Sequence, residues 1–148
     1  MDILRDNEHG RSGLAQLRAM IELGGRPPIG QTLGFTLVEA DEGRVVFEGQ
    51  PDERSLNPIG SVHGGYAAAV LDSCCGCATH TRLAATQGYT TMELKVAYHR
   101  ALKPGTRVRA EGLVLSFGRR AAFTEAKLYD EQERLCASAT STLLVFDL

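Results

Sequence analysis

The residues from Gly64 to Ala85 (GGYAAAVLDSCCGCATHTRLAA) constrain the fold more than any other part of the chain. They predict one long helix with apolar side chains on nearly every side, and a helix of that kind is buried. Most of these side chains are small, so a sheet can approach the helix closely. The Gln87-Gly88 pair then breaks the pattern. We therefore predict a central helix that the rest of the chain covers.

A shorter helix is predicted from Ser12 to Leu23. Ser12 is a favourable N-cap residue, and the apolar residues after it recur with the helical period. Two glycines end the helix, and Pro27 and Pro28 follow as helix breakers. The apolar stripe consists of Leu14, Leu17, Met20 and Ile21.

Alternation of apolar and polar residues predicts six strands. The first two, at 33–40 and 43–50, form a hairpin, and Pro51–Pro58 is a loop. In the third, Met92, Leu94, Val96 and Tyr98 are expected on one side, and Thr91, Glu93, Lys95 and His99 on the other. In the fourth, the apolar phase changes across Gly112, which indicates a bulge or a sharp bend. The last four strands are expected at 90–100, 106–117, 119–130 and 134–146.

The order of elements indicates the fold class. With 148 residues the chain suits one domain, residues 1–148, in which residues 1–30 supply the N-terminal helix and a connecting loop. The order of one helix, two strands, one long helix and four strands predicts an α+β fold. We expect a twisted, antiparallel six-stranded sheet wrapped around the central helix.

Composition excludes several classes of function. The formal charge of −2 and the isoelectric point near 6.1 give no reason to expect nucleic acid or a membrane surface as a partner. No apolar run has membrane-spanning length, and MDILRDNEHGRSG at the N-terminus lacks the apolar core of a signal peptide. We therefore expect a cytoplasmic protein.

The four cysteines have three interpretations. They can be buried thiols that act as small apolar residues, a metal site formed by Cys74, Cys77 and His80, or a nucleophile. We expect the first, and no metal or cofactor, because the sequence shows neither a second ligand cluster nor a partner base. Cys136 lies far from the other three, so a disulfide framework is not expected.

Asp72 is a carboxylate within this apolar helix, and the helix itself gives no reason for it. An ionised carboxylate is rarely buried without a partner. One helical turn away, on either side, the chain has only Ala68, Ala69, Cys75 and Gly76. Asp72 therefore either forms a salt bridge with another segment or faces a cavity in which it has a chemical role.

The start of the same helix holds a second candidate group. Gly64 and Gly65 open the helix, whose first amides have no partner within it and can bind an oxyanion. The alternative is that two glycines only allow a tight turn. His63 can cap the helix, orient a water molecule or act as a base. Asn57, extended before a proline, offers an amide that donates and accepts.

Helix geometry relates the two groups. Asp72 lies eight residues after Gly64, which is about 12 Å along one helix. A base or nucleophile must lie within about 3 Å of its target. If both residues act on one carbonyl group, they must come from two chains with antiparallel helices. A catalytic role therefore requires a dimer, and the exposed edge of the sheet can pair in it.

The chain resembles the hotdog-fold thioesterases, with most similarity to the PaaI-like acyl-CoA thioesterases of phenylacetic acid degradation. The resemblance rests on Asn57, on GSVHGGYAAAVLD, on YTTMELKVAYHRALKPG and on the strands from residue 108 onward. It covers roughly residues 30 to 147. It implies a sheet wrapped around a helix, homodimers that pair into tetramers, and hydrolysis of an acyl-CoA without a cofactor or a metal.

The resemblance also implies roles for individual residues. Asp72 would be the general base or nucleophile, and Gly64 would supply the amide that polarises the thioester carbonyl group. Asn57 and His63 would position the carbonyl group or the attacking water, with Gly65 beside them. Thr91 falls where relatives often have a Ser or Thr that contacts water or substrate from the neighbouring chain. Arg119 and Arg120, and also Arg100 with Lys103, are candidates for the CoA phosphates or ordinary solvated charges.

Two other functions are alternatives to hydrolysis of an acyl-CoA with an aromatic or other acyl group. A dehydratase of the same fold carries its His and acid in different local motifs, which are not found in this sequence. A non-catalytic acyl-CoA binding or sensing protein would not need Asp72. The complete set of Asn57, His63, Gly64 and Asp72 therefore favours a thioesterase.

Overall fold

The computed structural model describes residue 7 and residues 10–148. The expectation about a signal peptide concerns residues of which most lie outside this range. Three helices, a short 3-10 helix and six strands follow one another along the described chain. They are α1 (Gly13–Glu22), α2 (Pro28–Leu33), β1 (Phe35–Asp41), β2 (Arg44–Gly49), η1 (Glu53–Ser55), α3 (Gly64–His80), β3 (Gln87–Tyr98), β4 (Val108–Phe117), β5 (Ala121–Tyr129) and β6 (Leu135–Asp147).

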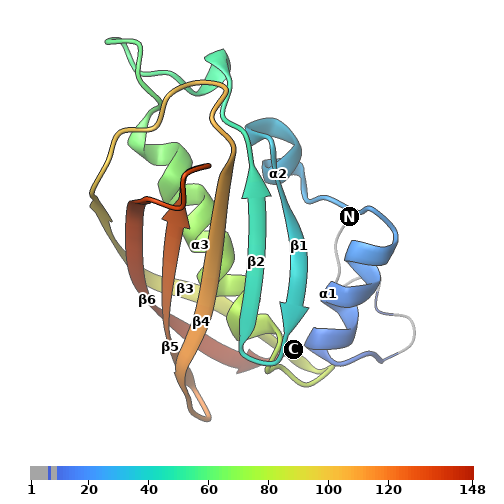
Figure 1. Cartoon of the computed structure of the whole chain (residues 1–148). Coiled ribbons are helices and arrows are strands. Elements are labelled where there is room, and N and C mark those ends of the chain that lie inside the picture. Colours follow the sequence, from blue (N-terminus) through green and yellow to red (C-terminus); the bar gives the residue numbers. More distant parts are fainter. Residues whose placement is uncertain (1–6, 8–9) are drawn as a thin grey trace.

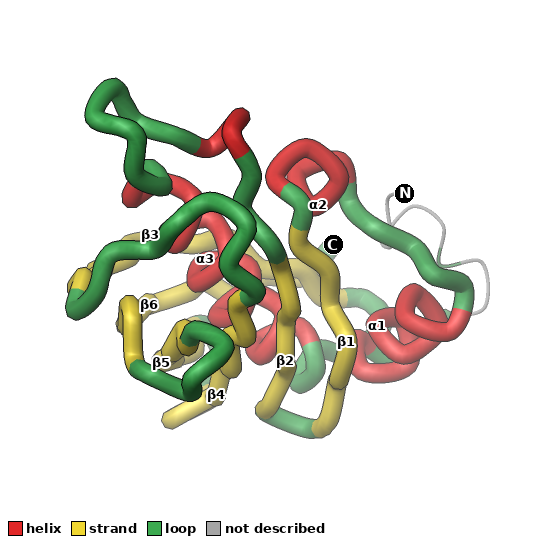
Figure 2. Tube along the Cα trace, turned by 45° about the horizontal axis from the view of Figure 1, so that its top comes forward, coloured by secondary structure: helices red, strands yellow, loops and turns green. Residues whose placement is uncertain are grey.

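The six strands form one antiparallel sheet in the order β1-β2-β4-β5-β6-β3. The sheet curves around α3, which lies against its concave face (Figure 1). β3 and β1 are the two edge strands, and α1 and α2 lie on the β1 side (Figure 2). The predicted α+β architecture is therefore confirmed.

The core forms where α3 meets the sheet. Leu71, Cys74 and Ala78 have no exposed surface, and they pack among side chains from all six strands. β4 approaches α3 closely at Gly112, because a Cβ atom there would lie 2.5 Å from the carbonyl oxygen of Cys74. The small residues of α3 thus allow the contact that the sequence predicts.

The helix α3 ends at His80 and not at Ala85. Thr81 makes two side-chain contacts there: its Oγ1 donates to the Ala78 carbonyl and accepts a 2.8 Å hydrogen bond from the Gly43 amide. The β1–β2 turn is thereby attached to the end of α3. The next residues turn away, and the Leu83 carbonyl accepts from the Gly13 amide at the start of α1. Tertiary contacts therefore end the helix.

The predicted orientation of β3 is wrong in its first half. The pairing with β6 shifts between Thr91 and Glu93, so a bulge at Met92 reverses the alternation. Met92 is 63% exposed, whereas Leu94 packs against the core. Thr91 lies on the same side as Leu94, toward α3. A bulge adds one residue to a strand, and a prediction from strict alternation along the sequence cannot detect it.

The irregularity in β4 is also displaced from its predicted position. The register with β5 shifts between Val114 and Ser116, beyond Gly112. Leu115, inside this bulge, is 60% exposed. Gly112 keeps the regular alternation, and it is a glycine because Cys74 leaves no room for a side chain.

The N-terminal segment contains one helix that was predicted and one that was missed. Ser12 caps α1, and its Oγ accepts a hydrogen bond from the Ala15 amide. Pro28, predicted to be a breaker, is instead the first residue of α2. Proline is tolerated at that position because its missing N–H would have no partner within the helix.

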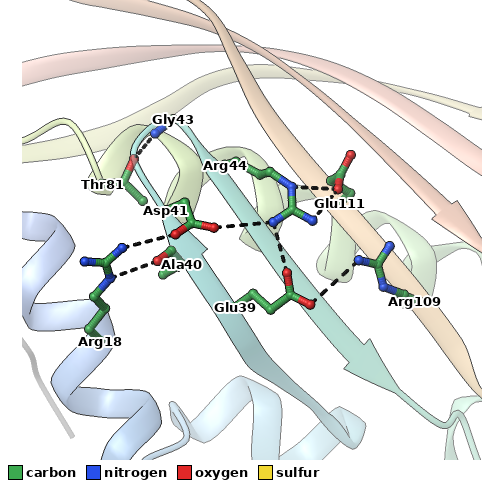
Figure 3. Close-up of polar contacts among 9 residues, drawn as sticks. All are labelled: Arg18, Glu39, Ala40, Asp41, Gly43, Arg44, Thr81, Arg109 and Glu111. Carbon is green, nitrogen blue, oxygen red and sulfur yellow. Dashed lines mark hydrogen bonds and ion pairs between the residues drawn. The ribbon is translucent and has the colours of Figure 1, made fainter.

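Ion pairs attach α1 to the β1–β2 hairpin (Figure 3). Arg18 donates to the Ala40 carbonyl and to Asp41. Arg44 extends the network on the outer face, where it contacts Glu39, Asp41 and Glu111. Exposed pairs contribute little to stability individually, so the contacts of Arg18 serve mainly to position α1 against the hairpin.

Replacement of Gly112 by alanine tests the close contact between β4 and α3. The new Cβ would meet backbone atoms of Cys74 that cannot move aside, so Gly112→Ala should lower the free energy of unfolding by about 1–3 kcal/mol. Gly118→Ala is the matched control, because its Cβ would lie 3.5 Å from its nearest neighbour. Urea denaturation measures both, and equal stabilities would contradict the prediction.

Because His80 is buried, we expect the protein to lose stability in mild acid. Its side chain is 3% exposed and shares a 2.8 Å hydrogen bond with Gln16 of α1. Burial lowers the pKa of His80 from 6.5 to about 4. Between pH 6.5 and pH 4 the His80 side chain is therefore protonated in the unfolded chain and neutral in the folded chain. Its contribution to the free energy of unfolding is complete above pH 6.5 and is lost as the pH falls toward 4.

Between pH 7.5 and pH 5 the free energy of unfolding should fall by about 2 kcal/mol. Urea denaturation at fixed protein concentration measures it. His80→Gln should remove most of this dependence. An equal loss in His80→Gln would mean that another group is responsible.

Candidate functional site

The loop before α3 is held by Asn57. Its side-chain Oδ1 accepts hydrogen bonds from the Ile59 and Ser61 amides, and its Nδ2 donates to Ser61 Oγ at 2.8 Å. A bridge between Leu56 and Val62 closes the same loop. The side chain of Asn57 therefore shapes the loop that leads into α3.

The first turn of α3 brings together three of the predicted site residues. His63 is the N-cap, and its Nδ1 accepts a 2.8 Å hydrogen bond from the Gly65 amide. Among the described residues, the Gly64 amide has no acceptor. The arrangement thus leaves one backbone donor available at the positive end of the helix.

Tyr98, at the end of β3, covers this turn and was not predicted as a site residue. Its hydroxyl donates a 2.7 Å hydrogen bond to the Gly64 carbonyl oxygen. A Cβ atom on Gly64 would lie 3.0 Å from the Tyr98 ring. In the sequence Tyr98 is only one more apolar residue of an alternating strand, so the pattern does not mark it.

A pocket of about 280 Å³ lies beside Gly64 and Tyr98. Most of its lining is apolar, with His63, Tyr98, His99 and Arg100 as its polar members. Arg100, a candidate for phosphate binding, therefore lies near the start of α3. The apolar lining residues are Val62, Ala67, Ala101, Leu102, Cys136 and Ala137.

Asp72 is half-buried, and its described partner is a hydroxyl group. Thr91 Oγ1 donates a 2.9 Å hydrogen bond to Asp72 Oδ1. Within the described part of the chain Asp72 forms no ion pair. The salt-bridge explanation of this acid therefore finds no support there, and the structure unites two predicted site residues, Asp72 and Thr91.

Asp72 lies on a stripe of α3 that its own chain leaves partly uncovered. The expectation that α3 is buried on all sides is therefore wrong along this stripe. It consists of Gly65, Ala68, Ala69, Asp72, Ser73 and Cys77. Gly64 and Asp72 are in one continuous helix, so they remain about 12 Å apart within a chain.

Arg119 and Arg120 are remote from the start of their own α3. They form the exposed turn between β4 and β5, at the opposite end of the sheet from the loop that precedes α3 (Figure 1). The structure therefore separates them from Asn57, His63 and Gly64 of the same chain.

The cysteines behave as apolar residues. All four are free, and Cys74, Cys75 and Cys136 are buried. Burial raises the pKa of the Cys75 thiol to about 11 and that of Cys74 well above its ordinary value. Protonated thiols are poor nucleophiles and poor metal ligands. The described residues contain no cluster of three or more metal-ligating side chains.

Comparison with known proteins identifies the family. The thioesterase superfamily matches residues 59–137. The proofreading thioesterase EntH of Klebsiella pneumoniae is 30% identical over 106 residues, which are 72% of this chain and 77% of EntH. The human acyl-coenzyme A thioesterase 13 is 30% identical over 96 residues, 64% of this chain and 66% of that protein. The chain therefore belongs to the thioesterase superfamily.

A solved structure narrows the assignment. A mutant of the phenylacetic acid degradation protein PaaI from Thermus thermophilus is 27% identical, with a TM-score of 0.74 over 80% of this chain and 98% of that one. The six-stranded sheet around a long helix is the hotdog fold, and the chain is a PaaI-like thioester hydrolase. No helix in the described range is long and apolar enough to cross a membrane.

Proposed function

We propose that the protein hydrolyses an acyl-CoA to a carboxylic acid and CoA, at sites formed by two chains. One observation carries the proposal: Asp72, oriented by Thr91, lies on the uncovered stripe of α3, and a free Gly64 amide opens the same helix. Neither group can reach the other within a chain. An antiparallel partner helix would bring each Asp72 to the other chain's Gly64.

In the proposed reaction Asp72 is a general base. Thr91 occupies Oδ1, so Oδ2 can accept a proton from a water molecule. The water oxygen bonds to the thioester carbon, the carbonyl oxygen gains negative charge, and the partner chain's Gly64 amide binds it. The carbonyl double bond then re-forms as the C–S bond breaks. The departing thiolate takes the proton that Asp72 had accepted, which restores the base.

Asn57, His63 and Gly65 support this chemistry in the proposal. Asn57 maintains the loop before α3, and the His63–Gly65 hydrogen bond fixes the first turn. Because His63 Nδ1 accepts from an amide, a neutral His63 carries its proton on Nε2. That N–H is a donor for the carbonyl oxygen or for the leaving sulfur.

The dimer interface that we propose joins the uncovered stripe of α3 to the edge of β3. β3 has a sheet neighbour on one side only, and edge strands of two chains can pair. A second pairing, into a dimer of dimers, would use the outer face of the sheet. Exposed apolar side chains gather there, namely Leu115, Phe123, Leu144 and Phe146.

The substrate class rests on relatives and on charge. One relative is an acyl-coenzyme A thioesterase by name, and PaaI is named for phenylacetic acid degradation, which favours an acyl-CoA with an aromatic acyl group. Arg100, and Arg119 or Arg120 from the partner chain, could bind the CoA phosphates. The four free thiols fit a reducing compartment, so we propose a cytoplasmic location.

Release of free thiol from a panel of acyl-CoAs tests the activity. Phenylacetyl, hydroxybenzoyl, short-chain and long-chain CoAs should include a substrate, and Asp72→Asn should lower kcat by about 100-fold or more. Asn keeps the size of the side chain and its acceptor for Thr91 but cannot take up a proton. Thr91→Val removes the hydrogen bond to Asp72 and should also lower kcat. Thr90→Val is its control, because Thr90 lies one residue away on the opposite side of β3.

Each failure of this experiment has a separate meaning. Tight binding of an acyl-CoA without any turnover would favour the binding or sensing protein. Turnover that Asp72→Asn leaves intact would exclude Asp72 as the base.

Complementation between two inactive variants tests the two-chain site. Gly64→Pro removes the proposed donor, and proline is favoured at the first position of a helix. Gly64→Ala adds the same Cβ atom but keeps the N–H, so it separates loss of the donor from crowding against Tyr98. We expect Gly64→Pro to be far less active than Gly64→Ala.

Coexpression of Asp72→Asn with Gly64→Pro should restore about a quarter of the natural activity, because each mixed dimer has one intact site. Asp72→Asn coexpressed with Asp72→Ala should restore none. Activity no higher than the sum of the two separate variants would place the whole site within one chain.

A further inference from the structure

The peptide between Gly64 and Gly65 is bound at both of its polar ends. Its carbonyl oxygen accepts the 2.7 Å hydrogen bond from the Tyr98 hydroxyl, and its N–H donates the 2.8 Å hydrogen bond to His63 Nδ1. A peptide group is planar, so partners on both sides fix its rotation about the chain axis.

Two features of this peptide allow it to rotate when it has no such restraint. Glycine populates both signs of φ, and here glycines flank the peptide on either side. Its N–H lies in the first turn of the helix, where the amides have no carbonyl partner within the helix. Rotation of the peptide would also displace the neighbouring Gly64 amide and the ring of His63.

Tyr98 is placed to supply the restraint from a different element. It is the last residue of β3, and its ring lies where a side chain on Gly64 would otherwise extend. β3 is held along its whole length by β6. The strand therefore provides a fixed point for a turn that two glycines leave flexible.

We infer that Tyr98 is a positioning residue for thioester hydrolysis. Through the Gly64 carbonyl it holds the first turn of α3, so that the Gly64 amide and the His63 ring keep the geometry in which they meet the substrate. This inference rests on the proposed function, because the Gly64 amide is the proposed oxyanion donor. Tyr98 itself does not take part in proton transfer.

Tyr98→Phe tests this role, because it keeps the ring against Gly64 and removes only the donor. We expect kcat to fall about tenfold, as for the loss of one hydrogen bond, with KM and melting temperature nearly unchanged. Tyr129→Phe is the matched control: Tyr129 is a half-buried tyrosine on β5 and does not line the pocket beside Gly64. A purely structural role would lower the melting temperature without this selective loss of kcat.

Two further measurements test the restraint by Tyr98 separately from the kcat of Tyr98→Phe. Exchange of the amide hydrogens of Gly65 and Tyr66, which are hydrogen-bonded to His63, should accelerate at least severalfold in Tyr98→Phe and not in Tyr129→Phe. The double variant Tyr98→Phe/His63→Ala should lose little more activity than His63→Ala alone, because both side chains hold the same peptide.

The outcomes separate this inference from the proposed function. If Tyr98→Phe has the kcat of the unsubstituted protein and Asp72→Asn is inactive, the role of Tyr98 is overturned and the proposed thioesterase function stands. If no acyl-CoA is hydrolysed, the proposed function fails. In that case unchanged exchange at Gly65 and Tyr66 overturns the restraint by Tyr98, and accelerated exchange upholds it.

Discussion

The structure depends on the close contact between α3 and the sheet. Gly112 lets β4 approach the backbone of α3 at Cys74, and residues of α3 without exposed surface fill the space between them. A larger residue at this contact would push the layers apart and disturb every strand that curves around the helix. The sheet covers α3 on most of its sides, and what it leaves uncovered is the stripe that carries Asp72.

A bulge in β3 brings the side chain of Thr91 into contact with Asp72. A regular strand would turn Thr91 away from α3, and the bulge at Met92 turns it toward Asp72. Beyond the bulge, Leu94 packs against the core and Tyr98 reaches Gly64. One strand thus orients the carboxylate and supports the first turn of the helix, at two points that are about 12 Å apart along α3.

The sequence was most informative where local chemistry decides structure. The run of small apolar residues predicts the central helix, and Ser12 predicts the start of α1, because these patterns act within a few residues. Thr91 was named as a site residue by resemblance, whereas its predicted direction was wrong, because a bulge depends on pairing with another strand. Tyr98 was missed for a similar reason: its partner, Gly64, lies 34 residues earlier in the chain.

The same distinction applies to Asp72. Its neighbours along the helix cannot stabilise a charge, so the sequence left two possibilities: a salt bridge with another segment, or a cavity in which Asp72 has a chemical role. The structure supplies a hydroxyl from β3, which orients a carboxylate without neutralising it. A salt bridge would have stabilised the charge and made the acid a weaker base. A half-buried carboxylate with one neutral donor keeps an oxygen free, and it lies on the stripe of α3 that the described part of the chain leaves partly uncovered.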